Sequence, residues 1–193
     1  MKNKKPRILV HSCCGPCSSY VISYLNKEYD VTILFYNPNI DTKEEFLKRL
    51  KAQKQIIKGL KSEKIKAKLI VIKYNPKEYL DYVVGYENEK EGGLRCNKCF
   101  QLRLNTTSKI ASKKKFDYFT TTLTVSPHKN STLINEIGNN IKSTSKFLES
   151  NFKKNDGYKK SIILSKKYNL YRQSYCGCSF SKSQMNKIEN VNN

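Results

Sequence analysis

Short apolar runs alternate with amphipathic segments along this chain, and this alternation limits its fold more than any other feature. We predict strands at residues 7–11, 31–36, 69–72, 116–123 and 146–148. Between and after them we predict helices at residues 19–28, 42–61, 76–82, 98–114, 133–137 and 158–168. Strands and helices that alternate at this spacing indicate an α/β fold, with a parallel sheet and helices on both of its faces.

Two of the predicted helices begin with residues that favour a helix start. Thr42 is followed three residues later by Glu45, which is the spacing of a capping box. Ser18 or Ser19 is expected to cap the first helix. We expect residues 1–193 to form a single α/β domain, in which roughly residues 150–193 make a C-terminal arm.

The chain is strongly basic, with 37 Lys and Arg residues against 16 Asp and Glu residues and a formal net charge of +21. This excess favours a polyanionic partner, because basic side chains release condensed counterions from a nucleic acid. Solvated helix faces rich in lysine are the alternative. No long apolar region follows the basic N-terminus, so we expect a cytoplasmic protein with no signal peptide, membrane span or membrane partner.

Seven cysteines fall into three tight groups that are separated by long stretches without cysteine. A cytoplasmic chain is not expected to use them for structural disulfides, so the grouping indicates metal ligands or redox groups. The three groups are Cys13, Cys14 and Cys17, then Cys96 and Cys99, and finally Cys176 and Cys178.

The first group lies on the turn after the first predicted strand. In open α/β sheets this turn binds ligands, at the carboxyl end of the strand and the positive end of the next helix. Thiols stand here in place of the glycines that would cradle a phosphate, which indicates a soft ligand such as a metal. Buried structural cysteines are the alternative. His11, beside the thiols, fits a core position as readily as a functional one.

The other two groups differ in what their spacing allows. Cys96 and Cys99 form a C-x-x-C motif near a helix start, which suits zinc, an iron–sulfur cluster or a redox dithiol. Cys176 and Cys178 would strain a zinc chelate, and they suit a reversible disulfide or a second metal. In a doubly wound sheet the first two groups can meet at the strand ends, and the C-terminal arm can fold over them. Four thiolates make an iron–sulfur site. Three of the seven cysteines are then left over, and this surplus of thiols suggests redox catalysis.

Basic residues near aromatic ones are the candidates for substrate contact. His128 and Lys129 follow the fourth predicted strand and could bind sugar or phosphate, or cap the next helix. Aromatic side chains also stand beside Lys153, Lys154 and Arg172. This interleaving fits base stacking and phosphate contact, although a solvated helix face would explain the lysines as well.

Taken together, the motifs resemble the QueH-type epoxyqueuosine reductases, the cysteine-rich enzymes of queuosine biosynthesis. The resembling segments follow the family order over nearly the whole chain: 10–17, 35–40, 91–100, 119–130, 152–154, 157–158 and 170–178. The resemblance implies a fold like that of the adenine nucleotide alpha hydrolases, within the HUP class. It also implies a [4Fe-4S] cluster and, as the last step of queuosine biosynthesis, the two-electron reduction of an epoxide on the wobble base of tRNA.

The resemblance further implies roles for single residues. The cluster ligands that it implies are Cys13, Cys14, Cys96 and Cys99, with Cys17 as a further candidate. It assigns Cys176 and Cys178 to a redox-active pair or to the ligands of a second, mononuclear iron. The aspartate that the family uses near its metals has no clear counterpart, because Asn151 stands where we expect it.

The implied reaction needs an external electron donor, because no side chain can supply the electrons. One rival is an ATP-using tRNA-modifying enzyme on the same fold. It should carry an S-G-G-x-D-S type loop, where residues 11–18 read His-Ser-Cys-Cys-Gly-Pro-Cys-Ser, so ATP is not expected as a cofactor. A second rival is a zinc-stabilised RNA-binding module without catalysis.

Overall fold

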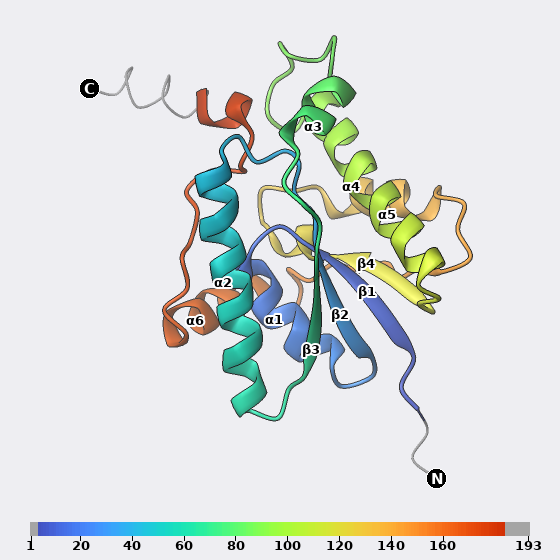
Figure 1. Cartoon of the computed structure of the whole chain (residues 1–193), viewed down its shortest axis with the longest axis vertical. Coiled ribbons are helices and arrows are strands. Elements are labelled where there is room, and N and C mark those ends of the chain that lie inside the picture. Colours follow the sequence, from blue (N-terminus) through green and yellow to red (C-terminus); the bar gives the residue numbers. More distant parts are fainter. Residues whose placement is uncertain (1–3, 184–193) are drawn as a thin grey trace.

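The computed structural model describes residues 4–183 and contains a five-stranded parallel sheet (Figure 1). The strand order is β3-β2-β1-β4-β5. The strands are β1 (Arg7–Ser12), β2 (Asp30–Phe35), β3 (Ala67–Val71), β4 (Tyr118–Thr121) and β5 (Lys146–Phe147). Because β1 is central, its carboxyl end and the turn that follows lie in the middle of the sheet edge.

Helices cover both faces of this sheet, as predicted for an α/β fold. They are α1 (Gly15–Leu25), α2 (Lys43–Ser62), α3 (Pro76–Tyr82), α4 (Leu94–Lys113), α5 (Ser131–Asn139) and α6 (Gly157–Lys167), with a 3₁₀ helix η1 (Thr122–Val125). Ile8 and Val10 pack against α1 and α2, whereas Leu9 packs on the opposite face against α4. The alternation along β1 therefore places one apolar core on each face. None of the described helices is both long and apolar enough to span a bilayer.

The first helix begins earlier than predicted. It starts at Gly15 with Pro16 in its first turn and Cys14 as the N-cap, so the predicted cap at Ser18 or Ser19 is wrong. A proline in the first turn has a fixed φ that suits a helix start, and its missing N–H removes no intrahelical bond. The two serines lie inside the helix, and Ser19 Oγ donates to the Pro16 carbonyl oxygen at 2.7 Å.

Other predicted boundaries differ in ways that matter for the site. The Thr42 cap is confirmed, since its side chain accepts from the Glu45 N–H at 3.2 Å. Helix α4 begins at Leu94, before the predicted start, so both cysteines of the second group lie inside it. Strand β4 ends at Thr121, whose hydroxyl accepts from the Leu123 N–H and starts η1.

After α6 the chain turns back and runs along α2 (Figure 1). Gln55 of α2 donates to the Tyr168 carbonyl oxygen at 2.7 Å, near the start of this segment. The segment brings the third cysteine group to the upper end of α2, beside the carboxyl ends of the strands. Of the predicted arm, residues 184–193 lie outside the described residues.

Candidate metal centre

The three cysteines of the first group lie close together at the turn between β1 and α1. The Sγ atoms of Cys13, Cys14 and Cys17 all lie within 4.8 Å of one another, and the first two are 3.7 Å apart. All seven cysteines of the chain are free thiols. Because the strand ends at Ser12 and the helix begins at Gly15, the turn is too short to separate these side chains. Such a set of soft ligands can hold a metal ion or one edge of a cluster.

Hydrogen bonds from neighbouring elements fix this turn. Gln53 Oε1 of α2 accepts from Ser12 Oγ at 2.7 Å and from Ser18 Oγ at 2.9 Å. Asn37 Nδ2, which follows β2, donates to the Ser12 carbonyl oxygen at 2.9 Å. The serines are completely buried, so their hydroxyls hold the turn rather than meet solvent.

The three thiols share hydrogen bonds, and this separates their pKa values. Hydrogen bonds from Cys14 and Cys17 hold the pKa of Cys13 well below its usual range, with help from the charges of Lys129 and Arg103. The hydrogen bond to Cys13, together with burial, raises the pKa of Cys14 to about 12. Hydrogen bonds to both neighbours raise the pKa of Cys17 well above its usual range. In the metal-free group Cys13 therefore loses its proton more readily than Cys14 and Cys17 do.

His11 is a satisfied core histidine. It is completely buried, and burial lowers its pKa to about 3, so the ring is neutral. Nε2 lies 3.1 Å from the Tyr36 carbonyl oxygen, which can only accept, so Nε2 carries the proton. Nδ1 then accepts from the Thr121 hydroxyl at 2.9 Å. His11 thus links β1 to both neighbouring strands just below the thiols.

The second group joins the first group to the third. Cys96 packs against the cluster that contains Cys13 and Cys14, whereas Cys99 packs with Cys178. Burial raises the pKa of Cys99 to about 12, and the negative charge of Cys176 adds to the rise. One helix therefore presents one thiol to the first turn and another to the C-terminal segment.

A cavity of about 500 Å³ opens beside these thiols, and we call it the thiol cavity. Its wall includes Cys13, Cys17 and Cys176, while Gln173 Nε2 approaches Cys14 Sγ to 3.1 Å. The predicted substrate residues that line this cavity are His128, Lys129 and Arg172. Two others do not line it: Lys153 donates to the Lys129 carbonyl oxygen at 2.7 Å, and Lys154 lines a separate cavity.

Arg103 lines the thiol cavity and is not among the site residues predicted from sequence. It is 1 % exposed, and its Nε donates to the Cys99 carbonyl oxygen at 3.2 Å. Within residues 4–183 the guanidinium forms no ion pair with a carboxylate, and its Nη2 has no hydrogen-bond partner. Burial acts to lower the pKa of Arg103, but the negative charges of Cys99, Cys176 and Cys13 outweigh it and raise the value. The sequence signal is its place four residues after Cys99 on one helix face.

The third cysteine group is docked on α2 by a buried ion pair. Arg49 Nε donates to Glu45 Oε1 at 2.6 Å, and both side chains are almost fully buried. The other two guanidinium nitrogens donate to the carbonyl oxygens of Cys176 at 2.9 Å and Tyr175 at 3.2 Å. Gly177 crosses this guanidinium with φ +123°, and an added Cβ would lie 2.9 Å from Arg49 Nη1. A glycine is therefore needed between the two cysteines.

The sequence of this chain matches that of a known protein family. The sequence model of the family described as "Epoxyqueuosine reductase QueH" matches residues 8–184. The chain belongs to the QueH family. The family resemblance predicted from the motifs is thus confirmed.

Similar QueH proteins come from distant bacteria. The epoxyqueuosine reductase QueH of Staphylococcus epidermidis is 42% identical over 183 residues, covering 92% of this chain and 77% of the relative. That of Streptococcus pyogenes is 42% identical over 180 residues, covering 92% and 71%. That of Thermotoga maritima is 34% identical over 179 residues, covering 90% and 89%. In this QueH chain the matched region contains all three cysteine groups.

The thiols of this QueH chain suit an iron–sulfur cluster better than a hard metal ion. Thiolates are soft ligands, and buried cations beside them offset the negative charge that a thiolate-bound cluster carries. Arg103 is a buried cation of this kind, left without a carboxylate partner in the described part of the chain. A metal centre of net negative charge would supply that missing partner.

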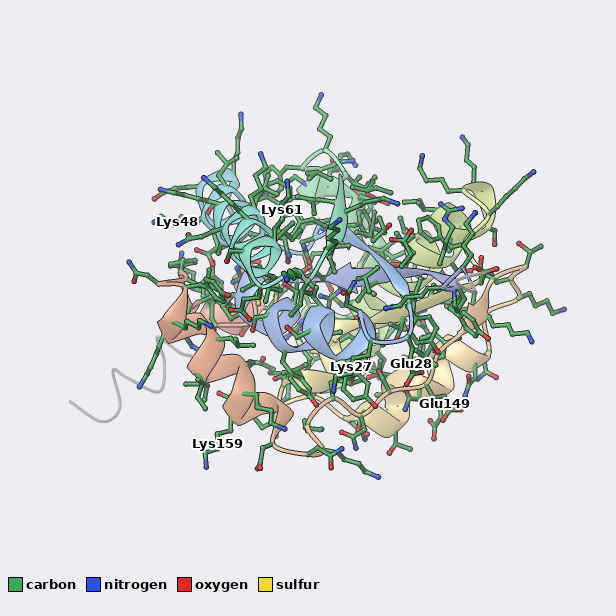
Figure 2. The ribbon with its side chains drawn as sticks, turned by 90° about the horizontal axis from the view of Figure 1, so that it is seen from below. Lys27, Glu28, Lys48, Lys61, Glu149 and Lys159 are labelled. Atoms are coloured by element: carbon green, nitrogen blue, oxygen red, sulfur yellow. The ribbon has the colours of Figure 1, made fainter. Side chains whose placement is uncertain are left out.

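The basic surface of the chain does not by itself mark one interface. Figure 2 shows Lys27, Lys48, Lys61 and Lys159 projecting into solvent in different directions. The cations at the thiol cavity are therefore more informative than the total charge. They include Lys129, which is half-buried beside the first cysteine group.

The separated pKa values predict which thiol reacts first. In metal-free, reduced protein, Cys13 should be alkylated by iodoacetamide ahead of Cys14 and Cys17. Because its pKa is lowered, Cys13 stays a thiolate, and so stays reactive, until the pH falls through that lowered value. Mass-spectrometric mapping of alkylated cysteines against pH measures this order. Three equal rates that all rise through the ordinary thiol range would contradict it.

The docking of the third group predicts a contrast between neighbouring residues of α2. Arg49→Met leaves the Glu45 carboxylate buried without its cation, so we expect a loss of about 3 kcal/mol in the free energy of unfolding. We also expect faster hydrogen exchange in residues 171–178. Lys48→Ala is the control, because Lys48 is exposed and, within residues 4–183, pairs only with exposed Glu44. Unchanged exchange in the Arg49 variant would show that the segment docks by other contacts.

Proposed function

We propose that this chain is an epoxyqueuosine reductase that acts on tRNA. The reaction takes two electrons and two protons, breaks both C–O bonds of the epoxide, and yields the alkene of queuosine and water. The observation that supports this most is that thiols of the first and third groups line one cavity together with cations, and that Cys96 and Cys99 pack beside those groups, in a member of the QueH family. Their surplus over the needs of a structural zinc favours redox chemistry.

In this proposal a [4Fe-4S] cluster is held by Cys13, Cys14, Cys96 and Cys99. Cys17 is a further candidate, because its Sγ lies within 4.8 Å of the Sγ atoms of Cys13 and Cys14. A bound cluster supplies single electrons that come from an external donor. The chain keeps this region away from bulk water, since Cys13, Cys14 and Cys99 are all buried.

Two cations of the thiol cavity have separate tasks in this proposal. Arg103 is a permanent charge that balances the thiolates. Burial acts to lower the pKa of Lys129, but the charges of Cys176, Cys13 and Cys17 raise it above the usual range, so the ammonium persists. An ammonium on the cavity wall can stabilise the alkoxide that develops as the epoxide C–O bond breaks.

Cys176 and Cys178 stay our candidates for a redox-active pair or for ligands of a second, mononuclear iron. Their surroundings differ, because Cys176 lines the thiol cavity and Cys178 is buried against Cys99. In this proposal Cys176 faces the substrate, and Cys178 faces α4.

The modified base would enter the thiol cavity from an anticodon loop, where bases can be turned out of the stack. His128 is exposed and Arg172 is exposed, so both can reach phosphates at the cavity mouth. Lys153 supports this region by holding the Lys129 carbonyl oxygen. Because the proposed substrate is tRNA, we expect the enzyme to act in the cytoplasm.

The test is turnover by anaerobically reconstituted protein. We expect broad visible absorption, and nucleoside analysis of epoxyqueuosine tRNA should show queuosine after a reductant is added. Cys176→Ser and Cys178→Ser should abolish turnover and keep most of the absorption, whereas Cys14→Ser should lose the absorption as well. Ser179→Ala is the matched control, because this exposed neighbour of Cys178 lines neither the thiol cavity nor the separate cavity that Lys154 lines. A colourless protein that contains only zinc would overturn the proposal and favour an RNA-binding module.

A further inference from the structure

One side chain of the C-terminal segment reaches into the first cysteine group. Gln173 Nε2 donates to Cys14 Sγ at 3.1 Å, although the two residues are 159 positions apart in the chain. Gln173 is partly buried and lines the thiol cavity, whereas Cys14 is completely buried. The contact therefore joins the wall of the cavity to a sulfur atom that solvent does not reach.

The backbone on each side of Gln173 is anchored to the body of the protein. Arg172 Nη1 donates to Ser165 Oγ of α6 at 3.2 Å. The Tyr175 hydroxyl donates to Asp41 Oδ1, just before α2, at 2.6 Å. Because the chain is held on both sides, the Gln173 side chain has a fixed starting point from which to reach the sulfur.

The far end of the Gln173 amide gains nothing from the fold. Its Oε1 atom is buried, and no hydrogen-bond donor reaches it from the described residues. A buried acceptor without a partner lowers stability instead of raising it. The N–H···S bond to Cys14 is therefore the contact that gives this amide a role.

A hydrogen-bond donor at Cys14 acts most strongly when that sulfur is bound to a cluster. Each electron that enters a cluster adds negative charge that is shared with its thiolate sulfurs, and an N–H donor stabilises this charge. The donor therefore stabilises the reduced cluster more than the oxidised one. Hydrogen bonds to the sulfurs are accordingly among the factors that set the reduction potential of an iron–sulfur cluster.

A second N–H donor lies at the other pair of proposed cluster ligands, but it belongs to the backbone. The Gly92 N–H donates to Cys96 Sγ at 3.2 Å. A backbone donor survives exchange of the side chain, whereas the donor of Gln173 does not. Gln173 is therefore the position at which a substitution can remove an N–H···S bond and leave the ligands themselves in place.

We propose that Gln173 is a positioning residue that raises the reduction potential of the iron–sulfur cluster by donating its Nε2 N–H group to Cys14 Sγ. This rests on the proposed function, because it assumes a cluster on Cys14. In the step concerned, the cluster accepts one electron from the external donor. The amide arrives on the same segment as Cys176, so electron uptake is favoured when that segment is docked and the thiol cavity is complete.

The first test measures the potential of the anaerobically reconstituted full chain by redox titration followed by EPR. Gln173→Leu removes the donor and keeps a side chain of similar size, so we expect a more negative midpoint potential than in the parent. Gln173→Glu also removes the donor and adds a negative charge, so its potential should fall further. An unchanged potential in Gln173→Leu would overturn the proposal.

Ser174→Ala is the matched control for the potential. Ser174 is the exposed next residue and lines the same cavity, but its hydroxyl forms no hydrogen bond with a cysteine in the described part of the chain. The variant should keep the potential of the parent. A shift as large as that of Gln173→Leu would show that any change in this wall alters the cluster, and would overturn the specific role of Gln173.

The second test detects the bond in the parent protein. Glutamine is isotopically labelled at its side-chain nitrogen, and the reduced cluster is examined by pulsed EPR. We expect a magnetic coupling to the labelled nitrogen that is present in the parent and in Ser174→Ala and absent from Gln173→Leu. A cluster-loaded parent without this coupling would overturn the proposal, even where Gln173→Leu fails to hold a cluster.

Thermal unfolding of the metal-free protein separates tuning from a structural role. Gln173→Leu removes a buried acceptor that has no partner among residues 4–183, so its thermal midpoint should not fall. A lower midpoint together with an unchanged potential would make Gln173 purely structural and overturn the proposal.

The proposed function can stand without this inference. Parent protein that forms queuosine while its potential does not depend on Gln173 would leave the proposed function in place and refute this inference alone. Parent protein that binds only zinc would overturn both.

Discussion

The buried guanidinium of Arg49 is the contact on which the rest of the site depends. It is held by Glu45 on its own helix and binds two carbonyl oxygens of the C-terminal segment, so α2 carries the third cysteine group to the strand ends. Asp41 adds to this docking, because its N–H donates to the Gly177 carbonyl oxygen at 2.8 Å. Burying this charge is tolerable because each of the three guanidinium nitrogens donates to an acceptor. Loss of the contact would open the thiol cavity on one side.

A second buried guanidinium, that of Arg103, differs from Arg49 in its partners. Arg103 is as deeply buried as Arg49, yet in the described part of the chain it meets carbonyl oxygen and thiols instead of a carboxylate. A cation left in this state favours any arrangement that brings negative charge to the thiols. The two arginines therefore have different roles. Arg49 holds the third cysteine group beside the others, and Arg103 sets the charge that the assembled site prefers.

Local patterns in the sequence predict the parallel sheet, the Thr42 cap and the grouping of the cysteines, because each depends on residues close together in the chain. Contacts between distant segments are not encoded in that way. Nothing near Gln53 indicates that it binds Ser12 and Ser18, and nothing near Arg49 indicates that it binds the segment before Cys176. A run of charged residues also does not show where each side chain lies: Lys153 and Lys154 are adjacent, yet the first supports the thiol cavity and the second lines a separate cavity along α1.

The central claim is that cysteine groups far apart in the sequence form one iron site. Anomalous diffraction at the iron edge, from crystals of anaerobically reconstituted protein, measures this most directly. The account predicts iron bonded to Sγ atoms of Cys13 and Cys14 from the first turn and of Cys96 and Cys99 from α4. Signal at the zinc edge alone, or iron bonded by only one of these groups, would contradict it.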